Sequence, residues 1–319
     1  MKLLIVSSIH KEAIERLSTS HDVVCAFDAD QEELQSKIHD REILIFRSGV
    51  QISREVLQRA AELKLLVRAG SGLDNVDLDY VRDSGLYLVR VPGPGARAVA
   101  EMAFAFMFGL ARQILTADRL WRQGRWVKSE IEGYLLKGKT LGIIGAGNIG
   151  STVGQMGALL GMEVIGCVEH PDEDARQRLL EKNIKLAPCH EVLSSGDFIS
   201  IHVPLKPTTF NLVDRQALSM MKQGAFLINL ARGGVVDEVA LLDALRFGKL
   251  KGAALDVHAK EGEGRISPLA ALQNVILTPH IGAMTVDSQK KIGERAVEVI
   301  DAFSQSEDYT MFTDRISVA

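Results

Sequence analysis

A glycine-rich hexapeptide at residues 145–150, Gly-Ala-Gly-Asn-Ile-Gly, is the segment of this sequence best suited to hold a phosphorylated ligand. A run typical of a buried strand, Thr140–Ile144, precedes it, and a helical pattern follows it to about Leu160. In this context the first glycine permits a tight turn, the second lets the backbone approach a pyrophosphate, and the third lets the helix contact the strand. Free N–H groups and the positive end of the helix dipole then hold the anion. The sequence therefore predicts a dinucleotide-binding turn with the contacting residues Gly145, Gly147, Asn148, Ile149 and Gly150.

The next predicted strand, Glu163–Cys167, should end in an acidic residue that accepts hydrogen bonds from the adenosine ribose. Val168 stands at the expected position and cannot do this, whereas its neighbour Glu169 can if the strand end is shifted by one residue. A carboxylate at Glu169 would repel the additional phosphate of NADP, so the sequence favours NAD. His170 and Arg176 are close enough in the sequence to reverse this preference, which leaves NADP as an open alternative.

Short β-branched runs alternate with helical patterns along the chain, which is typical of parallel sheets with helices on both faces. In the first half the expected strands are Leu3–Val6, Val23–Phe27, Ile43–Phe46, Leu65–Arg68 and Tyr87–Val89. In the second half they are Thr140–Ile144, Glu163–Cys167, Ile184–Leu186, Phe198–Ile201, Ala225–Ile228, Gly252–Leu255 and Val275–Leu277. The pattern predicts an α/β fold with two units.

A loop signal at residues 91–95, Val-Pro-Gly-Pro-Gly, separates the two series of strands. One long helix is expected after it, from about Ala96 to Trp121. A last helix is expected from about Thr285 to Phe303, before a polar tail. This helix could cross back to the first unit and make that unit discontinuous, a question that periodicity leaves open.

Composition and charge are those of an ordinary globular protein. Hydrophobic residues make up 46% and charged residues 24% of the 319 positions, which is too apolar for a disordered chain. The 37 basic and 41 acidic residues give a formal charge of 37 − 41 = −4, so neither nucleic acid nor an anionic membrane is expected as a partner. Three scattered cysteines without a Cys-x-x-Cys pair argue against disulfides and a cysteine metal site, and they suit a cytoplasmic location. The apolar stretch at residues 98–111 is shorter than the ~20 residues that span a bilayer.

Six sequence blocks occur in a fixed order: Arg68–Asp77, Gly138–Gly145, His202–Leu205, Asn229–Glu238, Leu255–Val257 and Thr278–Gly282. In this order they resemble the D-isomer-specific 2-hydroxyacid dehydrogenase family, most closely its phosphoglycerate dehydrogenase-like branch. The resemblance implies two Rossmann-like, doubly wound parallel-sheet domains around a central cleft. A flavodoxin-like substrate domain would comprise residues 1–97 and 288–319, and an NAD-binding domain residues 98–287. The resemblance also implies a homodimer formed through the cofactor domains.

The chemistry of such an enzyme defines three side-chain roles. Oxidation of a 2-hydroxy acid removes a hydroxyl proton and a hydride from one carbon, and the nicotinamide takes the hydride. A histidine is suited to accept the hydroxyl proton, and an arginine is suited to bind the planar substrate carboxylate. A carboxylate hydrogen-bonded to the histidine ring fixes its tautomer and favours its protonated form. The resemblance assigns these roles to His280, Arg232 and Glu261, with Glu263 as the alternative to Glu261. All three follow predicted strands, so they should meet at the carboxyl edge of a parallel sheet.

Further cofactor contacts are implied by the resemblance. Besides the glycine turn and Glu169, the expected contacts are His202, Val203, Pro204, Leu230, Ala231, Asp256, Gly282 and Ala283. Asp256 is expected at the nicotinamide end of the cofactor. His202 is expected to line the adenine side as a structural residue, and His258, which replaces an aromatic residue, is also expected to be structural.

Substrate contacts are implied in the first domain. Backbone N–H groups of Gly70, Ser71 and Gly72 are expected to bind the substrate carboxylate. Arg47 either reaches a distal phosphate or hydroxyl group or is a plain charge at a strand end. Gly95 and Ala98 stand where the phosphoglycerate branch usually has asparagine and serine, while Arg97 offers a compensating charge.

The resemblance implies a small 2-hydroxy or 2-keto acid as the substrate. 3-Phosphoglycerate, and with it serine biosynthesis, is the leading expectation, followed closely by glyoxylate or hydroxypyruvate. Oxidation of phosphite is a further alternative, and no C-terminal regulatory domain is expected. A different class of function is an NAD(H)-sensing binding protein similar to transcriptional corepressors of this fold. Such binding proteins are expected to have long flexible tails, so the short terminal segments of this sequence favour the enzyme over the binding protein.

Overall fold

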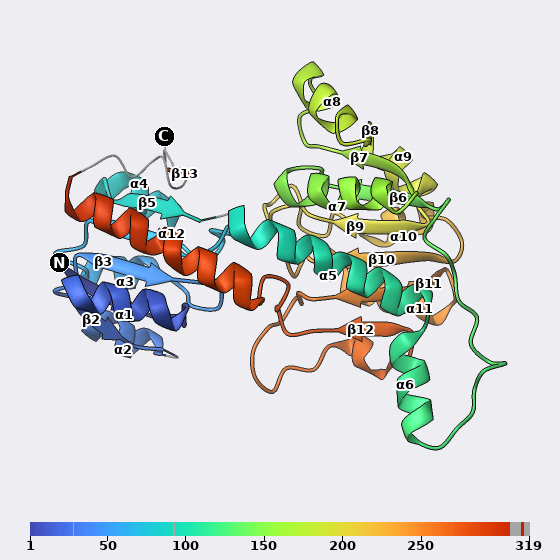
Figure 1. The fold of residues 1–319 in the computed structure, drawn as a ribbon, viewed down its shortest axis with the longest axis horizontal. Coiled ribbons are helices and arrows are strands. Elements are labelled where there is room, and N and C mark those ends of the chain that lie inside the picture. The colour runs from blue at the N-terminus through green and yellow to red at the C-terminus, as the bar shows by residue number, and fades with distance from the viewer. Residues whose placement is uncertain (28, 92, 307–313, 316–319) are drawn as a thin grey trace. The chain divides into compact units, whose positions relative to one another are not determined.

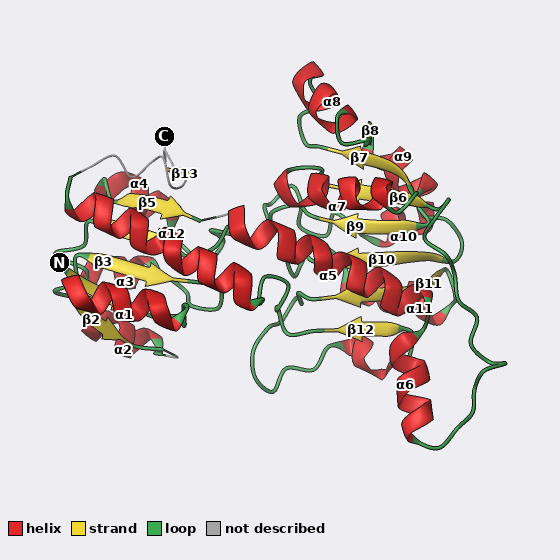
Figure 2. Cartoon of the chain, in the orientation of Figure 1, coloured by secondary structure: helices red, strands yellow, loops and turns green. Residues whose placement is uncertain are grey.

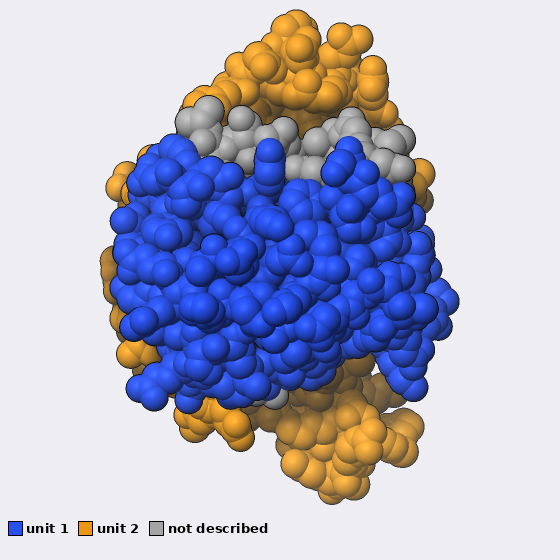
Figure 3. All heavy atoms as spheres, turned by 90° about the vertical axis from the view of Figure 1, so that its left-hand side faces the viewer, with its two compact units in different colours: residues 1–98, 283–319 blue, residues 99–282 orange. Residues whose placement is uncertain are grey.

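The structure, a computed structural model, describes residues 1–27, 29–91, 93–306 and 314–315. The chain divides into two units (Figure 3). Unit 1 consists of Met1–Ala98 and Ala283–Ala319, and unit 2 of Val99–Gly282. The last helix therefore belongs to the first unit, which is discontinuous in sequence.

Unit 1 contains a parallel sheet in the order β2-β1-β3-β4-β5, with β13 antiparallel at the edge beside β5. The strands are β1 (Lys2–Ile5), β2 (Asp22–Cys25), β3 (Ile43–Phe46), β4 (Leu65–Arg68), β5 (Tyr87–Arg90) and β13 (Asp314–Arg315). All four residues of β3 and of β4 are buried, as expected for central strands covered on both faces. The sequence predicted the five parallel strands but not β13.

Helices cover both faces of the unit 1 sheet (Figure 2). They are α1 (Lys11–Ser20), α2 (Gln31–Lys37), α3 (Arg54–Arg59), α4 (Leu78–Ser84) and α12 (Val286–Ser304). The apolar face of α12, including Ile292 and Ala296, packs with Ala13 and Leu17 of α1 over one face of the sheet. Gly293 permits this approach, because a Cβ atom there would lie 2.9 Å from the Cβ of Ala13. Burial of this apolar face is what joins the C-terminal helix to the N-terminal unit.

Unit 2 contains seven parallel strands in the order β8-β7-β6-β9-β10-β11-β12 (Figure 1). They are β6 (Thr140–Ile144), β7 (Glu163–Cys167), β8 (Lys185–Leu186), β9 (Phe198–Ile201), β10 (Ala225–Asn229), β11 (Leu250–Leu255) and β12 (Val275–Leu277). Counted from β6, this order is that of a Rossmann sheet with one additional strand. All seven strands are parallel, and the order in which successive strands are added switches from one side of β6 to the other between β8 and β9. Ligands of such sheets bind at the carboxyl ends of the strands near this switch.

The helices between these strands are α7 (Asn148–Leu159), α8 (Glu173–Leu180), α9 (Cys189–Ser195), α10 (Arg215–Met220) and α11 (Glu238–Arg246), with a 3₁₀ turn at Pro268–Ala271. Leu218 of α10 and Leu241 of α11 share a buried cluster with Leu227 of β10 and Leu255 of β11. This packing fixes the positions of the strand ends and of the loops that follow them.

The expected single helix from Ala96 to Trp121 is wrong. Two helices occur instead, α5 (Gly93–Ala111) and α6 (Ile114–Arg122), bent by 60°. Gln113 between them has a left-handed φ of 51°, and its side-chain amide donates to the carbonyl of Glu132 at 2.8 Å. A tertiary contact thus ends the helix where the sequence has neither glycine nor proline. Among the described residues no single helix is long and apolar enough to span a membrane, although this bent pair meets the length and composition test jointly.

Candidate active site

The glycine turn lies between β6 and α7, as its sequence predicts. The N–H groups of Gly145 and Ala146 donate to the carbonyl of Cys167 at 3.1 and 2.9 Å, which fastens the turn to the end of β7. Gly145 has a φ of +89°, and a Cβ atom on Gly150 would lie 2.2 Å from the Gly145 carbonyl oxygen. Both positions therefore require glycine.

Gly147 has a different reason to be glycine. An added Cβ atom there would have no heavy atom within 4 Å, so the space in front of this residue is open. Gly147 is also the N-cap of α7, whose first N–H groups lack helical partners. An open space at a helix N-terminus fits the close approach of a pyrophosphate, so these residues suit the dinucleotide that the motif predicts.

The carboxylate of Glu169, beyond the end of β7, binds a lysine in this structure. Lys206 Nζ donates to Glu169 Oε2 at 2.9 Å. This hydrogen bond and the lysine charge lower the pKa of Glu169, so the side chain is a carboxylate at neutral pH. Lys206, from the loop after β9, was not anticipated, because nothing in the sequence connects the two loops.

His202 lies against the glycine turn as a neutral residue. Its backbone carbonyl oxygen would lie 2.8 Å from a Cβ atom on Gly145, and its ring Nε2 is 2.8 Å from Ser200 Oγ. Burial lowers the pKa of His202 to about 3, so the ring carries no charge at neutral pH. The next residue, Val203, also contacts the turn, since its Cγ1 would lie 2.7 Å from the same Cβ. The contacts support the structural interpretation of His202.

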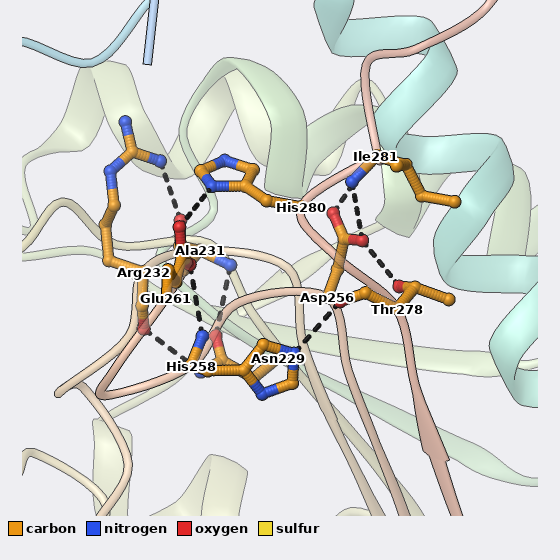
Figure 4. Close-up of polar contacts among 10 residues, drawn as sticks. Asn229, Ala231, Arg232, Asp256, His258, Glu261, Thr278, His280 and Ile281 are labelled. Atoms are coloured by element: carbon orange, nitrogen blue, oxygen red, sulfur yellow. Dashed lines mark hydrogen bonds and ion pairs between the residues drawn. The ribbon is translucent and has the colours of Figure 1, made fainter. Parts of the chain in front are cut away.

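His280 and Glu261 form a hydrogen-bonded pair (Figure 4). His280 Nδ1 is 3.0 Å from Glu261 Oε2, and the two side chains are 29% and 41% exposed. The other carboxylate oxygen, Oε1, accepts the backbone N–H of His258 at 3.1 Å. Burial raises the pKa of Glu261, but the hydrogen bond and charge of His280 and the N–H of His258 outweigh it and lower the pKa overall. An ionised Glu261 keeps the proton of a neutral His280 on Nδ1 and leaves Nε2 able to accept a proton.

Arg232 lies in the loop after β10, where Asn229 determines the backbone conformation. The side-chain oxygen of Asn229 accepts the N–H of Ala231 at 3.0 Å, and its amide donates to the carbonyl of Arg232 at 3.1 Å. Arg232 Nη1 donates to the Ala231 carbonyl at 2.7 Å. Figure 4 shows the contact of the Arg232 guanidinium with the Ala231 carbonyl and the contact of the His280 ring with the Glu261 carboxylate.

A close backbone contact connects the Arg232 loop with the loop that carries Glu261. A Cβ atom on Gly233 would lie 1.8 Å from the carbonyl oxygen of His258, so only glycine fits there. His258 in turn has its Nε2 2.9 Å from the carbonyl of Thr278, a geometry in which the ring must donate. The contacts of His258 thus join three strand-end loops of unit 2, in agreement with its expected structural role.

Asp256 holds the loop that carries His280. It is 2% exposed, and its carboxylate accepts the Thr278 hydroxyl and the N–H groups of Ile281 at 2.8 Å and Gly282 at 2.7 Å. The N–H of His280 donates to the Asp256 carbonyl at 2.7 Å, and His280 has a left-handed φ of 56°. Such a conformation persists in a non-glycine residue only where its surroundings enforce it. In this structure Asp256 is therefore a positioning residue for His280.

Unit 1 has its own polar residues at the carboxyl ends of its strands. Arg68 Nε donates to the carbonyl of Gly72 at 2.8 Å, and Arg90 Nη1 to that of Ser71 at 3.5 Å. Within the described parts of the chain, the N–H groups of Ser71 and Gly72 have no acceptor. Gly70 has a φ of +155°, where its Cβ atom would meet the Arg68 guanidinium at 2.5 Å. Two N–H donors beside two guanidinium groups form a suitable anion site.

Arg47, after β3, is a partly buried cation. Its guanidinium donates to the carbonyl of Ser8 at 3.3 Å and lies 3.2 Å from Met284 Sδ. Burial lowers the pKa of Arg47, and its buried Nε has no partner among the described residues. Asn75 donates to the Arg47 carbonyl at 3.0 Å and so fixes its backbone.

The structure brings most of the predicted residues of unit 2 to the carboxyl edge of its sheet. The residues that sequence reasoning missed are the supports Asn229, Gly233, Thr278 and Lys206. Asn229, Gly233 and Thr278 lie within the sequence blocks used for the resemblance, so block membership was the available signal. Their function as supports depends on contacts between loops, which are visible only in three dimensions.

Comparison with known proteins gives consistent results. The family model for the D-isomer specific 2-hydroxyacid dehydrogenase, NAD binding domain, matches residues 104–282. The D-3-phosphoglycerate dehydrogenase of Methanocaldococcus jannaschii is 38% identical, with 94% of this chain and 57% of the relative covered. The hydroxypyruvate reductase of Thermotoga maritima is 34% identical, with 92% and 94% covered.

Solved structures show the same architecture. The D-lactate dehydrogenase of Aquifex aeolicus complexed with NAD and lactic acid has a TM-score of 0.84 and 31% identity, with 96% of each chain covered. The chain spans about half the length of the phosphoglycerate dehydrogenases that it matches, but nearly the full length of the hydroxypyruvate reductase.

Proposed function

The chain belongs to the D-isomer-specific 2-hydroxyacid dehydrogenase family, and from this premise we propose that it interconverts a small 2-hydroxy acid and the corresponding 2-keto acid with NAD(P). The observation that carries the proposal is the pair formed by His280 and Glu261 at the carboxyl edge of the unit 2 sheet, 3.0 Å apart. Unit 2, with the glycine turn, is the cofactor domain, and unit 1 is the substrate domain. Bound NAD(P) supplies the hydride acceptor or donor.

Each side chain has a role that follows from its contacts. His280 Nε2 takes the hydroxyl proton during oxidation and returns it during reduction. Glu261 holds the ring through Nδ1 and stabilises the imidazolium that forms. Arg232 provides a planar cation for the substrate carboxylate and for the charge that develops on the reacting oxygen. Asp256 and His258 keep the three loops in this arrangement.

The substrate carboxylate is also bound by unit 1 in this proposal. The N–H groups of Ser71 and Gly72 have no acceptor in the described parts of the chain, and these two groups form the anion site. The N–H of Gly70, expected from the sequence to take part, instead donates to the Arg68 carbonyl at 2.8 Å. Arg47 adds a cation that forms no ion pair among the described residues. A partly buried cation without a carboxylate partner suits a second negative group on the substrate.

3-Phosphoglycerate is therefore the leading substrate, and serine biosynthesis the corresponding pathway. A phosphate at the end of the substrate distal to the reacting carbon would supply the anion that Arg47 lacks. Hydroxypyruvate or glyoxylate is the second candidate, because the T. maritima relative of nearly equal length is a hydroxypyruvate reductase.

A panel of substrates tests both the proposed dehydrogenase activity and the proposed leading substrate. Oxidation of NADH and NADPH is followed by absorbance with phosphohydroxypyruvate, hydroxypyruvate, glyoxylate and pyruvate. Turnover of at least one 2-keto acid is expected, with the highest kcat/KM for phosphohydroxypyruvate. The variant Arg47→Gln should lower kcat/KM about 10-fold for phosphohydroxypyruvate and leave glyoxylate nearly unchanged. Equal losses for both substrates would refute the phosphate contact, and absence of all turnover would refute the proposed activity.

A homodimer formed through the cofactor domains is part of the proposal. Trp121 of α6 and Trp126 of the following loop are 61% and 72% exposed, and their rings pack edge-on at 5.4 Å. Leu115 and Leu135, in the same part of the chain, are 55% and 71% exposed. Exposed apolar side chains concentrated in one segment are typical of an interface. Sedimentation should give a dimer that Trp126→Ser weakens, whereas Leu159→Ser, an exposed control elsewhere in unit 2, should not.

A further inference from the structure

A cavity of about 530 Å³ lies beside the glycine turn in unit 2. One side is formed by the turn and the start of α7, including Gly147, Asn148 and Ser151. The other side is formed by Val168 after β7 and by Arg178 and Lys182, from α8 and the residues after it. The cavity therefore adjoins both the turn that suits a pyrophosphate and the strand end where an adenosine ribose binds in this fold.

Two cations line this cavity without carboxylate partners. Lys182 is partly buried, and its Nζ donates to the buried hydroxyl of Ser151 at 2.7 Å. Arg178 is exposed, and neither it nor Lys182 forms an ion pair among the described residues. His170 and one carboxylate, Glu181, also line the cavity. Its permanent charges are thus two positive and one negative.

The residue that would exclude an anion from this cavity is missing. In sheets of this kind an acid at the end of the second strand accepts the ribose hydroxyls and repels a phosphate at the 2′ position. Val168 occupies that position and lines the cavity. The neighbouring Glu169 is not among the lining residues, and its carboxylate is bound to Lys206 at 2.9 Å.

We infer that this cavity binds the 2′-phosphate of NADP(H), with Arg178 and Lys182 as the phosphate-binding residues and Val168 as the residue that permits it. The inference rests on the proposed function, since it concerns the cofactor of the same site. It reverses the preference for NAD expected from Glu169 in the sequence. Arg178 contributes a planar group with several donors, and Lys182 a point charge already positioned by Ser151.

Nucleotide fragments test the inference without any enzyme activity. Adenosine 2′,5′-bisphosphate and 5′-AMP differ by the 2′-phosphate alone, and their dissociation constants for the complete chain are measured by calorimetry. The bisphosphate should bind at least about 10-fold more tightly, and this advantage should shrink as salt concentration rises. NADH and NADPH are titrated in parallel, and NADPH should bind at least as tightly as NADH.

Substitutions locate the effect. Arg178→Gln should weaken the bisphosphate about 10-fold and leave 5′-AMP within 2-fold. Arg176→Gln is the matched control, because Arg176 is exposed on the same helix, pairs with Glu173 and does not line the cavity. Val168→Asp should weaken NADPH about 10-fold and leave NADH unchanged or improved.

The outcomes separate this inference from the proposed function. Binding of NADH and 5′-AMP without any advantage for the bisphosphate would overturn the inference and leave the proposed function intact. Equal losses in Arg178→Gln and Arg176→Gln would also overturn it. Failure of all four nucleotides to bind would overturn both.

Discussion

Replacement of Glu261 by glutamine tests the proposed role of this carboxylate. Glu261 accepts two hydrogen bonds, one from His258 N–H at 3.1 Å and one from His280 Nδ1 at 3.0 Å. Glutamine has a single acceptor oxygen, so it can serve only one of these donors. If that oxygen faces His258, the amide group faces His280 and favours the tautomer with its proton on Nε2. That tautomer cannot accept the substrate proton.

The expected magnitude follows from the distance and the exposure of the pair. Two unit charges 4 Å apart interact by about 4 kcal/mol at an effective dielectric constant of about 20, and by about 1 kcal/mol in water. The side chains are 29% and 41% exposed, which places the interaction between these limits. A loss of about 2 kcal/mol of transition-state stabilisation corresponds to about a 30-fold decrease in kcat/KM. Loss of the reactive tautomer would increase this effect.

The assay compares Glu261→Gln with Glu263→Gln in the oxidation direction, where His280 must accept the proton, using the 2-hydroxy acid that corresponds to the best 2-keto acid and saturating oxidised cofactor. Glu263 is an exposed carboxylate in the same loop and was the alternative candidate in the sequence, which makes it a matched control. The control should retain at least half of the wild-type kcat/KM, and both variants should bind the cofactor normally. Activity of Glu261→Gln within 3-fold of wild type, or a larger loss in Glu263→Gln, would refute the reasoning.

Three further predictions concern the supports of the site. Gly147→Ala should keep the melting temperature but weaken cofactor binding at least about 10-fold, because its Cβ atom enters the open space proposed for the pyrophosphate. Gly233→Ala should lower the melting temperature by several degrees, because its Cβ atom would lie 1.8 Å from a carbonyl oxygen. Equal melting temperatures of the two variants would contradict this prediction. Asp256→Asn should speed hydrogen exchange at Ile281 and lower stability by about 1–3 kcal/mol, since it weakens the acceptor of two backbone N–H groups; unchanged exchange would contradict it. The pKa of His202 is about 6.5 in the unfolded chain and about 3 in the folded protein. Between these two pH values only the unfolded chain binds the proton, so the free energy of unfolding decreases as the pH is lowered through this range. His202→Asn should remove this part of the pH dependence in denaturant titrations, and an identical dependence in both proteins would count against it.

The sequence predicted the two α/β units because their strands are short, buried runs bounded by turns. The strands Ile43–Phe46, Leu65–Arg68 and Val275–Leu277 occur with the predicted bounds. The break between α5 and α6 was missed because a tertiary contact of Gln113, and no residue of helix-breaking type, produces it. The return of α12 to unit 1 depends on packing against Ala13 and Leu17, which periodicity alone does not reveal.

The candidate site could be predicted in part. Family blocks pointed to His280 and Glu261, and the structure places them in contact. That both carboxylate oxygens of Asp256 accept hydrogen bonds from residues 278–282 was not predictable, because these contacts depend on the path of the loop after β12. Nor was it predictable that Lys206 would bind Glu169, a contact between residues from two different loops.

The central claim is that His280 exchanges a proton with the substrate while the hydride moves. Its most direct test is the single-turnover rate of reduced-cofactor oxidation in His280→Gln, with cofactor and 2-keto acid both saturating. Loss of general acid catalysis predicts a rate lower by about 10²–10⁴-fold, with cofactor affinity unchanged. A single-turnover rate within 10-fold of wild type would contradict the account.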